Sequence, residues 1–153
     1  MNEHEQSYTT AFEAEQTPDE VFAAINNVRG WWSGEIEGET DQPGAVFTYR
    51  VPGVHYCAMR ITEFVPGRKI VWRVLDSDIS YTEARHEWND TSITFEIAPK
   101  DGKTEVRFTH VGLVPSDECY GSCSNGWSLL VGGNLRKLIA TGLDQPSPFA
   151  KLA

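Results

Sequence analysis

The sequence predicts an α+β fold in which a curved antiparallel sheet of about seven strands wraps around a long C-terminal helix. Three observations carry this prediction. Apolar residues alternate with a period of two through most of the middle of the chain, short turn signals separate those segments, and an amphipathic helical stripe follows them. A meander joined by short turns is antiparallel and has one face to bury, and a long amphipathic helix is the natural cover for that face.

The chain opens with a strand and a short helix. Residues 7–14 alternate between the two faces of an extended chain, which predicts a strand. In the following TPDEVFAAINNV, Thr17 suits the N-cap, Pro18 suits the first helical position and Glu20 completes a capping box. We expect a helix of about ten residues here. We also expect a second short helical turn at GWW, residues 30–32.

The middle of the chain predicts six further strands. The gaps between them contain QPG, VPG twice and KDG, so the connections are expected to be hairpins. The stretch from Asp76 to Asp90 is polar, and we expect it to be mainly a long loop with some strand. The expected strands are residues 34–39, 44–51, 54–65, 69–76, 92–99 and 103–112.

The last part of the chain returns to a helical period. Ser116 is the expected N-cap, because the acids Asp117 and Glu118 behind it suit the first turn of a helix. A helix of about 25 residues is expected to run from there to a stop at Gly142. Its apolar stripe consists of Trp127, Leu130, Val131, Leu135, Leu138 and Ile139. Gly126, Gly132 and Gly133 lie inside this helix, and they predict a bend or the close approach of a neighbour.

Length and charge exclude several classes of function. A chain of 153 residues predicts one domain, residues 1–153, with an ordered core of about residues 7–142. The 13 basic and 22 acidic residues give a net charge of -9, which repels nucleic acid and anionic membrane. No apolar run approaches the roughly 20 residues of a spanning helix, and the first residues do not form a signal peptide. Three cysteines do not make a disulfide framework, so we expect the reducing cytoplasm.

Several segments of the sequence resemble the motifs of one known superfamily. FTHVGL (108–113), ECYGSCSNGW (118–127) and LRKLIATG (135–142) resemble the closing signature of the START-like, polyketide-cyclase (SRPBCC) superfamily. TPDEVFAAI and the WW pair are similar to the opening of one of its families, and SITFEI with KTEVRFTHVGL to its last hairpin. That family is named for homologues of the activator of the heat-shock-protein-90 ATPase. The resemblance covers about residues 7–142.

The resemblance implies a helix-grip fold with a cavity between sheet and helix. It implies binding of a small hydrophobic or amphipathic molecule such as a lipid, sterol or polyketide. Two alternatives stay open. One is a co-chaperone-type module of the stress response, with a chaperone as its partner. The other is a cyclase-like or hydrolase-like enzyme that uses His110 in the cavity. No cofactor is expected, and the oligomeric state is not predicted.

Strand parity and the helical stripe select the side chains that would line this cavity. The expected ligand-binding residues are Phe47, Tyr49, Met59, Trp72, Phe95, Phe108, His110, Trp127 and Val131. His110 shares a face with Val106 and Phe108, so it is expected to point inward. It can then hydrogen-bond to the following loop, contact a ligand, or act as a general base. Other polar candidates are His55, Arg60, Arg73 and Glu83, but parity places the two arginines on the outer face.

Cys119 and Cys123 lie four residues apart and on one helical face. Zinc would need two further ligands, His110 and either Asp117 or Glu118. The alternatives are small half-buried residues at a helix start, which we expect, or a redox-sensitive thiol. No metal site and no catalytic triad is therefore expected, and GEIEGE (34–39) is expected to be a solvated edge strand.

Overall fold

The computed structural model describes residues 7–32, 34–80, 82–83 and 85–146. Within this part of the chain, seven antiparallel strands form one sheet in the order β1-β7-β6-β5-β4-β3-β2, which confirms the predicted fold class. The strands are β1 (Tyr8–Ala14), β2 (Glu35–Glu37), β3 (Val46–Val51), β4 (His55–Val65), β5 (Lys69–Ile79), β6 (Ser92–Lys100) and β7 (Lys103–Val111). Because β1 pairs with β7, the first and last strands of the chain lie side by side.

The first helix forms as its sequence predicts. Helix α2 (Pro18–Asn26) has Thr17 as N-cap, and the Thr17 hydroxyl accepts from the backbone N–H of Glu20 over 3.2 Å. The Glu20 carboxylate accepts in return from the backbone N–H of Thr17, also over 3.2 Å. A 3₁₀ turn, η1 (Val28–Gly30), follows and carries the chain to the tryptophan pair at 31–32.

Strand β5 is longer than its sequence predicts. Asp76 was expected to open a loop, but β5 continues to Ile79 and pairs with the first residues of β4, with His55 opposite Ile79. Register shifts at Ala58/Met59 and Ile61/Glu63 accommodate the two long strands. The sequence pattern does not show this last part of the strand, because its residues are mostly polar. Only Ser77 and Ile79 turn inward.

The hairpin between β6 and β7 is closed by Asp101 and Gly102. Both residues have positive φ, 50° and 81°. A two-residue turn with this geometry matches the twist of the strands, and Asp-Gly is a favoured sequence for it. This local signal places the two strands that carry Phe95 and His110 in a fixed register, Phe95 opposite Phe108.

The C-terminal helix is 22 residues long and has three parts. They are α3 (Tyr120–Trp127), the π-helical segment η2 (Ser128–Leu135) and α4 (Arg136–Thr141). Gly142, with φ of 74°, ends the helix as predicted. The glycines at 132 and 133 lie in η2, and an added Cβ on either would meet nothing within 4 Å. The expected close approach of a neighbour is therefore wrong for these two positions.

The helix starts later than predicted, and the turn before it is held by another part of the chain. Ser116 does not cap it, because residues 114–117 form a turn in which the Asp117 carboxylate accepts from the backbone N–H of Val114. Instead, the Glu87 carboxylate accepts from the backbone N–H groups of Glu118 and Cys119, over 2.8 and 3.1 Å. A carboxylate at this end also suits the helix dipole. The loop between β5 and β6 is thereby attached to the start of the helix.

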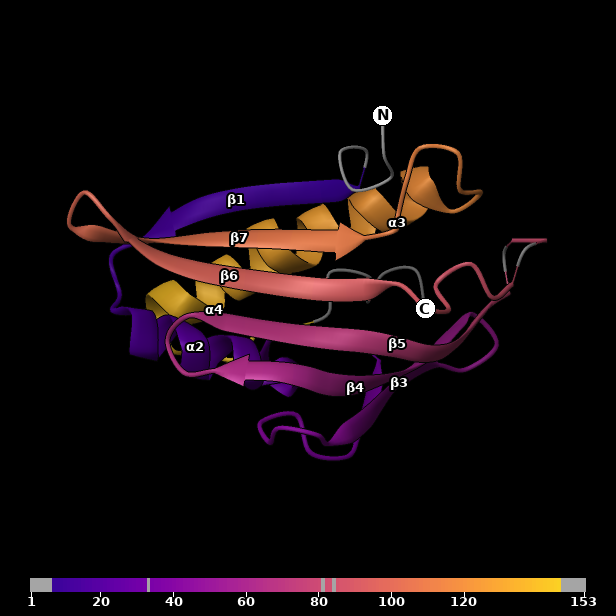
Figure 1. Cartoon of the computed structure of the whole chain (residues 1–153), viewed down its shortest axis with the longest axis horizontal. Coiled ribbons are helices and arrows are strands. Elements are labelled where there is room, and N and C mark those ends of the chain that lie inside the picture. The colour runs from indigo at the N-terminus through magenta and orange to yellow at the C-terminus, as the bar shows by residue number, and fades with distance from the viewer. Residues whose placement is uncertain (1–6, 33, 81, 84, 147–153) are drawn as a thin grey trace.

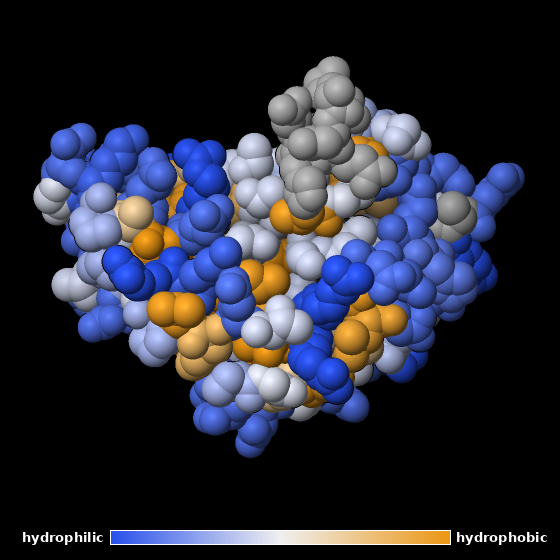
Figure 2. Space-filling view, in the orientation of Figure 1, coloured by the Kyte–Doolittle hydropathy of each residue, from blue (hydrophilic) through white to orange (hydrophobic). Residues whose placement is uncertain are grey.

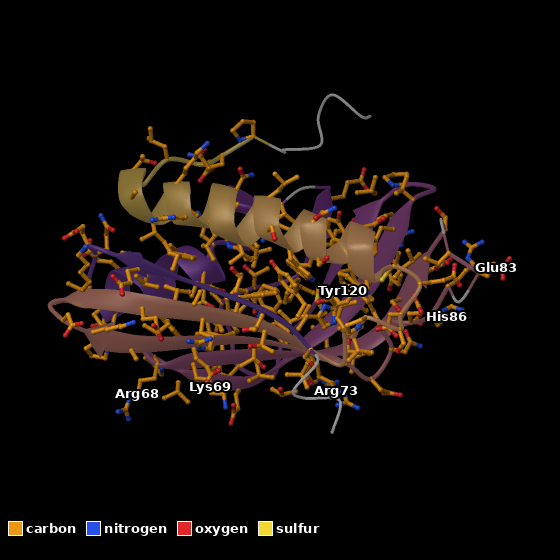
Figure 3. The ribbon with its side chains drawn as sticks, turned by 90° about the horizontal axis from the view of Figure 1, so that it is seen from above. Arg68, Lys69, Arg73, Glu83, His86 and Tyr120 are labelled. Atoms are coloured by element: carbon orange, nitrogen blue, oxygen red, sulfur yellow. The ribbon has the colours of Figure 1, made fainter. Side chains whose placement is uncertain are left out.

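The molecule has two layers. The C-terminal helix runs obliquely behind the sheet, and α2 lies beside the end of α4 (Figure 1). Seen from above, the helix layer and the sheet enclose a dense layer of side chains, while Arg68, Lys69 and Arg73 project from the opposite side of the sheet (Figure 3). On that outer face apolar residues are scattered among polar ones (Figure 2). No described helix is long and apolar enough to cross a membrane.

We predict that Glu87→Ala lowers the free energy of unfolding by about 1 kcal/mol, because the backbone N–H groups of Glu118 and Cys119 lose their acceptor. Glu87→Gln keeps one acceptor oxygen and should cost less. Urea unfolding measures both, with the exposed Glu96→Ala as a control that should stay within about 0.5 kcal/mol of the parent protein. Equal stabilities for Glu87→Ala and the control would contradict the assignment of Glu87 as the acceptor that holds the turn before the helix.

Candidate functional site

All five tryptophans of the chain meet between the sheet and the C-terminal helix. Each is at most 5% exposed. They come from four places, which are the segment after η1, strand β5, the loop between β5 and β6, and helix α3. We call this group, Trp31, Trp32, Trp72, Trp88 and Trp127, the tryptophan cluster. It forms the candidate site because it joins every layer of the fold.

Three indoles of the cluster lie nearly parallel. The rings of Trp31 and Trp32 lie 6.2 and 5.9 Å from that of Trp72, with interplanar angles of 10° and 5°. Tyr49 stacks on Trp32 at 4.5 Å. Phe47 and Phe95 present their edges to Trp72, each at 5.0 Å. Such offset-stacked and edge contacts are the favoured arrangements of aromatic rings.

The second part of the cluster surrounds His110. Trp88 stacks on Trp127 at 5.7 Å, and both present their rings to the imidazole, at 4.7 and 6.0 Å. His55 approaches the other side of Trp88 at 4.6 Å. Trp88 was not among the expected site residues, because it lies in a polar stretch that has no periodic pattern to show which way it points.

His110 is fully buried, as its strand parity predicts, and both of its ring nitrogens are engaged. The indole N–H of Trp127 donates to Nδ1 over 3.1 Å, so Nδ1 carries the lone pair. Nε2 then carries the proton and donates to the Thr91 hydroxyl over 2.8 Å, and that hydroxyl donates to the Trp88 carbonyl over 2.6 Å. Burial, with a smaller effect of His55, lowers the pKa of His110 to about 3. The imidazole is neutral and held in one tautomer.

The Trp72 indole nitrogen differs from the ring nitrogens of His110 in its hydrogen bonding. It is buried, and no hydrogen-bond acceptor for its N–H lies within the described part of the chain; the same is true of the Trp88 indole nitrogen. A buried donor without a partner costs about 1–3 kcal/mol. Unpartnered groups of this kind are uncommon in folded proteins and call for a specific explanation, such as a bound molecule or an ordered water.

All nine expected ligand-binding residues are brought together in one layer, but they pack against one another. None is more than 5% exposed, and Phe108 and Trp127 approach to 4.7 Å. Two pockets in the described chain, of about 540 and 80 Å³, lie elsewhere, beside α2 and beside the β3–β4 turn. Neither is lined by any of the nine. A ligand between sheet and helix would therefore have to displace side chains, and the nine residues remain a prediction.

The cysteines are buried in the start of the C-terminal helix and in β4. Cys119 and Cys123 are 1% and 6% exposed, and Cys57 is fully buried. All three are free thiols. Burial raises the pKa of Cys57, and contact with Cys123 followed by burial raises that of Cys119, so these groups stay protonated. A protonated thiol is a poor nucleophile, which disfavours the redox alternative.

The possible zinc ligands are used for other contacts. His110 binds Trp127 and Thr91, and the Glu118 carboxylate accepts from the backbone N–H of Glu83 over 2.9 Å. Among the residues that the structure describes, no group of three or more His, Cys, Asp or Glu side chains could hold a metal ion.

The other polar candidates lie outside the cluster or at its rim. Arg60 and Arg73 face each other across β4 and β5 on the exposed side, as parity predicts, and Arg73 pairs with Asp90 at 3.4 Å. Glu83 lies in the exposed loop between β5 and β6 (Figure 3). The GEIEGE segment forms the short edge strand β2, also as predicted.

We predict that stability falls as the pH drops below about 6.5. Burial lowers the pKa of His110 to about 3 and that of His55 to about 4, so the unfolded chain binds protons that the folded chain excludes. Between pH 6.5 and 5 each histidine should remove about 2 kcal/mol of stability. His110→Gln should remove its share of this slope in denaturant unfolding, and the exposed His86→Gln should not. An identical slope for parent and His110→Gln would contradict the buried neutral imidazole.

The fold and site can now be compared with known proteins. The family model described as Activator of Hsp90 ATPase homolog 1-like protein matches residues 15–140. The solution structure of the Aha1 dimer from Colwellia psychrerythraea has a TM-score of 0.70 at 19% identity and covers 89% of this chain and 97% of that chain. CalU16 from Micromonospora echinospora has a TM-score of 0.59 at 16% identity and covers 89% and 77%. DynU16, from the dynemicin biosynthetic locus, has a TM-score of 0.64 at 14% identity and covers 91% and 49%.

One curated relative also matches. It is the F-box protein PP2-A11 of Arabidopsis thaliana, 31% identical over 85 residues, which are 56% of this chain and 26% of the relative. The match thus spans about a quarter of that protein's length. The structural neighbours are too distant in sequence to show more than the fold, whereas the family model covers most of the chain. The chain belongs to the family of Activator of Hsp90 ATPase homolog 1-like proteins, within the helix-grip superfamily that its sequence resembles.

Proposed function

We propose that this protein binds a small, flat, largely apolar molecule within the tryptophan cluster, and that the molecule carries a hydrogen-bond acceptor. The unpartnered indole N–H of Trp72 is the observation that carries the proposal. A carbonyl or similar oxygen of the ligand would satisfy this buried donor, which the described protein groups leave unsatisfied. Trp72 is one of the nine expected ligand-binding residues, and the burial of all nine between sheet and helix supports the same function.

The arrangement of the rings supports a flat ligand. The Trp32 ring is nearly parallel to those of both Tyr49 and Trp72, with centroids 4.5 and 5.9 Å away, and Trp32 is 5% exposed. A planar molecule that took the place of the Trp32 ring would keep both stacking contacts. Burial of its apolar surface would contribute about 25 cal/mol per Å².

His110 has a structural role in this proposal. Its Nδ1 lone pair accepts from Trp127 and its Nε2 proton is donated to Thr91, so a ligand would have to break one of these bonds to contact the ring. A pKa of about 3 also makes the imidazole a weak base at neutral pH. These contacts favour binding over the cavity-enzyme alternative. They assign His110 to holding Trp127, and Trp72 replaces it as the proposed polar anchor.

A matched pair of ligands tests the proposal. We expect 1-acetonaphthone to bind about tenfold more tightly than 1-ethylnaphthalene, because only the ketone can accept from Trp72. NMR titration of the uniformly ¹⁵N-labelled protein should move the Trp72 indole N–H resonance with the ketone. In Trp72→Phe, which keeps a ring and removes the donor, the two ligands should bind equally.

Two results would contradict this account. One is that neither naphthalene perturbs any resonance of the tryptophan cluster. The other is that both bind the parent protein with the same affinity, since the Trp72 donor would then have no role. Trp31→Phe is the matched control variant, because the Trp31 indole N–H already donates to the Ile25 carbonyl over 3.0 Å. It should preserve the preference for the ketone.

Family membership favours a second candidate, a co-chaperone-type interaction with heat-shock protein 90. The three buried free thiols suit the reducing cytoplasm in which such an interaction would take place. If this candidate is right, the purified chain should raise the ATPase rate of purified heat-shock protein 90 in a concentration-dependent manner. An unchanged rate together with no co-elution would remove it, and would leave the ligand-binding proposal untouched.

A further inference from the structure

A second site lies beside helix α2, away from the tryptophan cluster. This pocket, which we call the α2 pocket, has a volume of about 540 Å³ and lies between the end of α2, residues 38–41 and the end of β4. The volume is within the range of small-molecule sites. Its lining includes Phe22, Asn26, Arg29, Glu39, Asp41 and Phe64.

The wall of the pocket is fixed by hydrogen bonds. The Thr40 hydroxyl donates to the Asn26 carbonyl over 2.7 Å, which holds residues 38–41 against the end of α2. The Arg29 guanidinium donates to the carbonyls of Ile36 and Gly38 over 3.1 and 3.0 Å. The pocket is therefore bounded by segments that are attached to one another, and Arg29 is engaged with backbone oxygens.

Asn26 provides an unsatisfied acceptor in this wall. The residue is 7% exposed, and its side-chain oxygen is buried with no hydrogen-bond partner in the described chain. An amide oxygen accepts hydrogen bonds and donates none, so a group that completes it must carry an N–H or O–H. A ligand that satisfies this oxygen must therefore carry a hydrogen-bond donor.

The electrostatics of the pocket favour a donor with a positive charge. The C-terminal end of a helix carries partial negative charge, and α2 has no basic residue in its last turn to offset it. Glu39 and Asp41 add two exposed carboxylates to the lining, against the single guanidinium of Arg29, so its charged side chains sum to a net charge of -1. The net charge of -9 attracts cations to the molecule as a whole.

The remaining part of the lining is apolar. Phe22 and Phe64 meet edge to face with ring centroids 4.9 Å apart. They offer a surface for a ring or short hydrocarbon chain, and the face of an aromatic ring also attracts a nearby cation. Apolar and anionic features lie in one pocket, and no residue of the tryptophan cluster lines it.

We propose that the α2 pocket binds a small amphiphilic amine, with its ammonium group toward Asn26 and Asp41 and its apolar group on Phe22 and Phe64. This site is separate from the proposed site between sheet and helix. The two can be occupied independently, so that the failure of either proposal leaves the other standing.

Phenethylamine, which is cationic at pH 7, is the probe for this site. Calorimetry and NMR titration should show that it binds at least fivefold more tightly than neutral 2-phenylethanol or anionic phenylacetate. The shifted amide resonances should belong to residues 22–29, 38–41 and 64, with the indole resonances of the tryptophan cluster unchanged. Binding should weaken as salt is raised, because exposed charges are screened.

Paired variants test the named residues. Asp41→Asn removes one exposed carboxylate and should weaken phenethylamine binding several-fold, whereas Asp101→Asn, in the turn between β6 and β7, should not. Asn26→Ala should also weaken binding, with circular dichroism to confirm that the variant folds. The proposal is overturned if phenethylamine binds no better than 2-phenylethanol, if Asp41→Asn matches Asp101→Asn, or if the shifted resonances lie in the tryptophan cluster.

Discussion

The layer of aromatic rings between the sheet and the C-terminal helix is the feature on which the rest of the structure depends. A sheet with one apolar face must be covered, and here the cover is held by stacked indoles and by the buried hydrogen bond from Trp127 to His110. That bond joins the helix to β7. It also aligns the imidazole toward Thr91, whose hydroxyl reaches the Trp88 carbonyl. Sheet, helix and the loop between β5 and β6 are thus connected through one imidazole.

The same layer explains why the expected cavity is filled. Each ring that points inward finds another ring at a normal packing distance, so the rings exclude open space from the layer. Closure leaves the buried indole N–H groups of Trp72 and Trp88 without an acceptor in the part of the chain that the structure describes. The layer is closely packed and still leaves a central donor without an acceptor within the described chain. Such a layer is well suited to exchange a side-chain contact for a ligand contact. The π-helical segment Ser128–Leu135, which faces the same layer, is a kind of irregularity that often marks functional sites.

Much of the fold follows from local patterns in the sequence. The capping box at Thr17, the Asp-Gly turn and the alternation of Ile70, Trp72 and Val74 each specify their structure within a few residues. The parts that could not be predicted depend on distant residues. The turn before α3 is held by Glu87, from a different loop, which accepts from the N–H groups of Glu118 and Cys119, and β5 extends because the start of β4 is there to pair with it. The inward direction of His110 followed from strand parity. That Trp127 and Thr91 occupy both of its ring nitrogens could be seen only in the tertiary structure. The role of Trp88 was not visible in the sequence, because a loop has no period.

The central claim is that Trp72 donates to a bound molecule when the protein carries its ligand. A high-resolution crystal structure of the freshly purified protein tests it most directly, by the electron density at the Trp72 indole nitrogen. The account predicts a flat molecule in the place of the Trp32 ring, with an oxygen about 2.9 Å from Trp72 Nε1. Density for an ordered water at that nitrogen, with Trp32 still stacked on Tyr49 and Trp72, would contradict it.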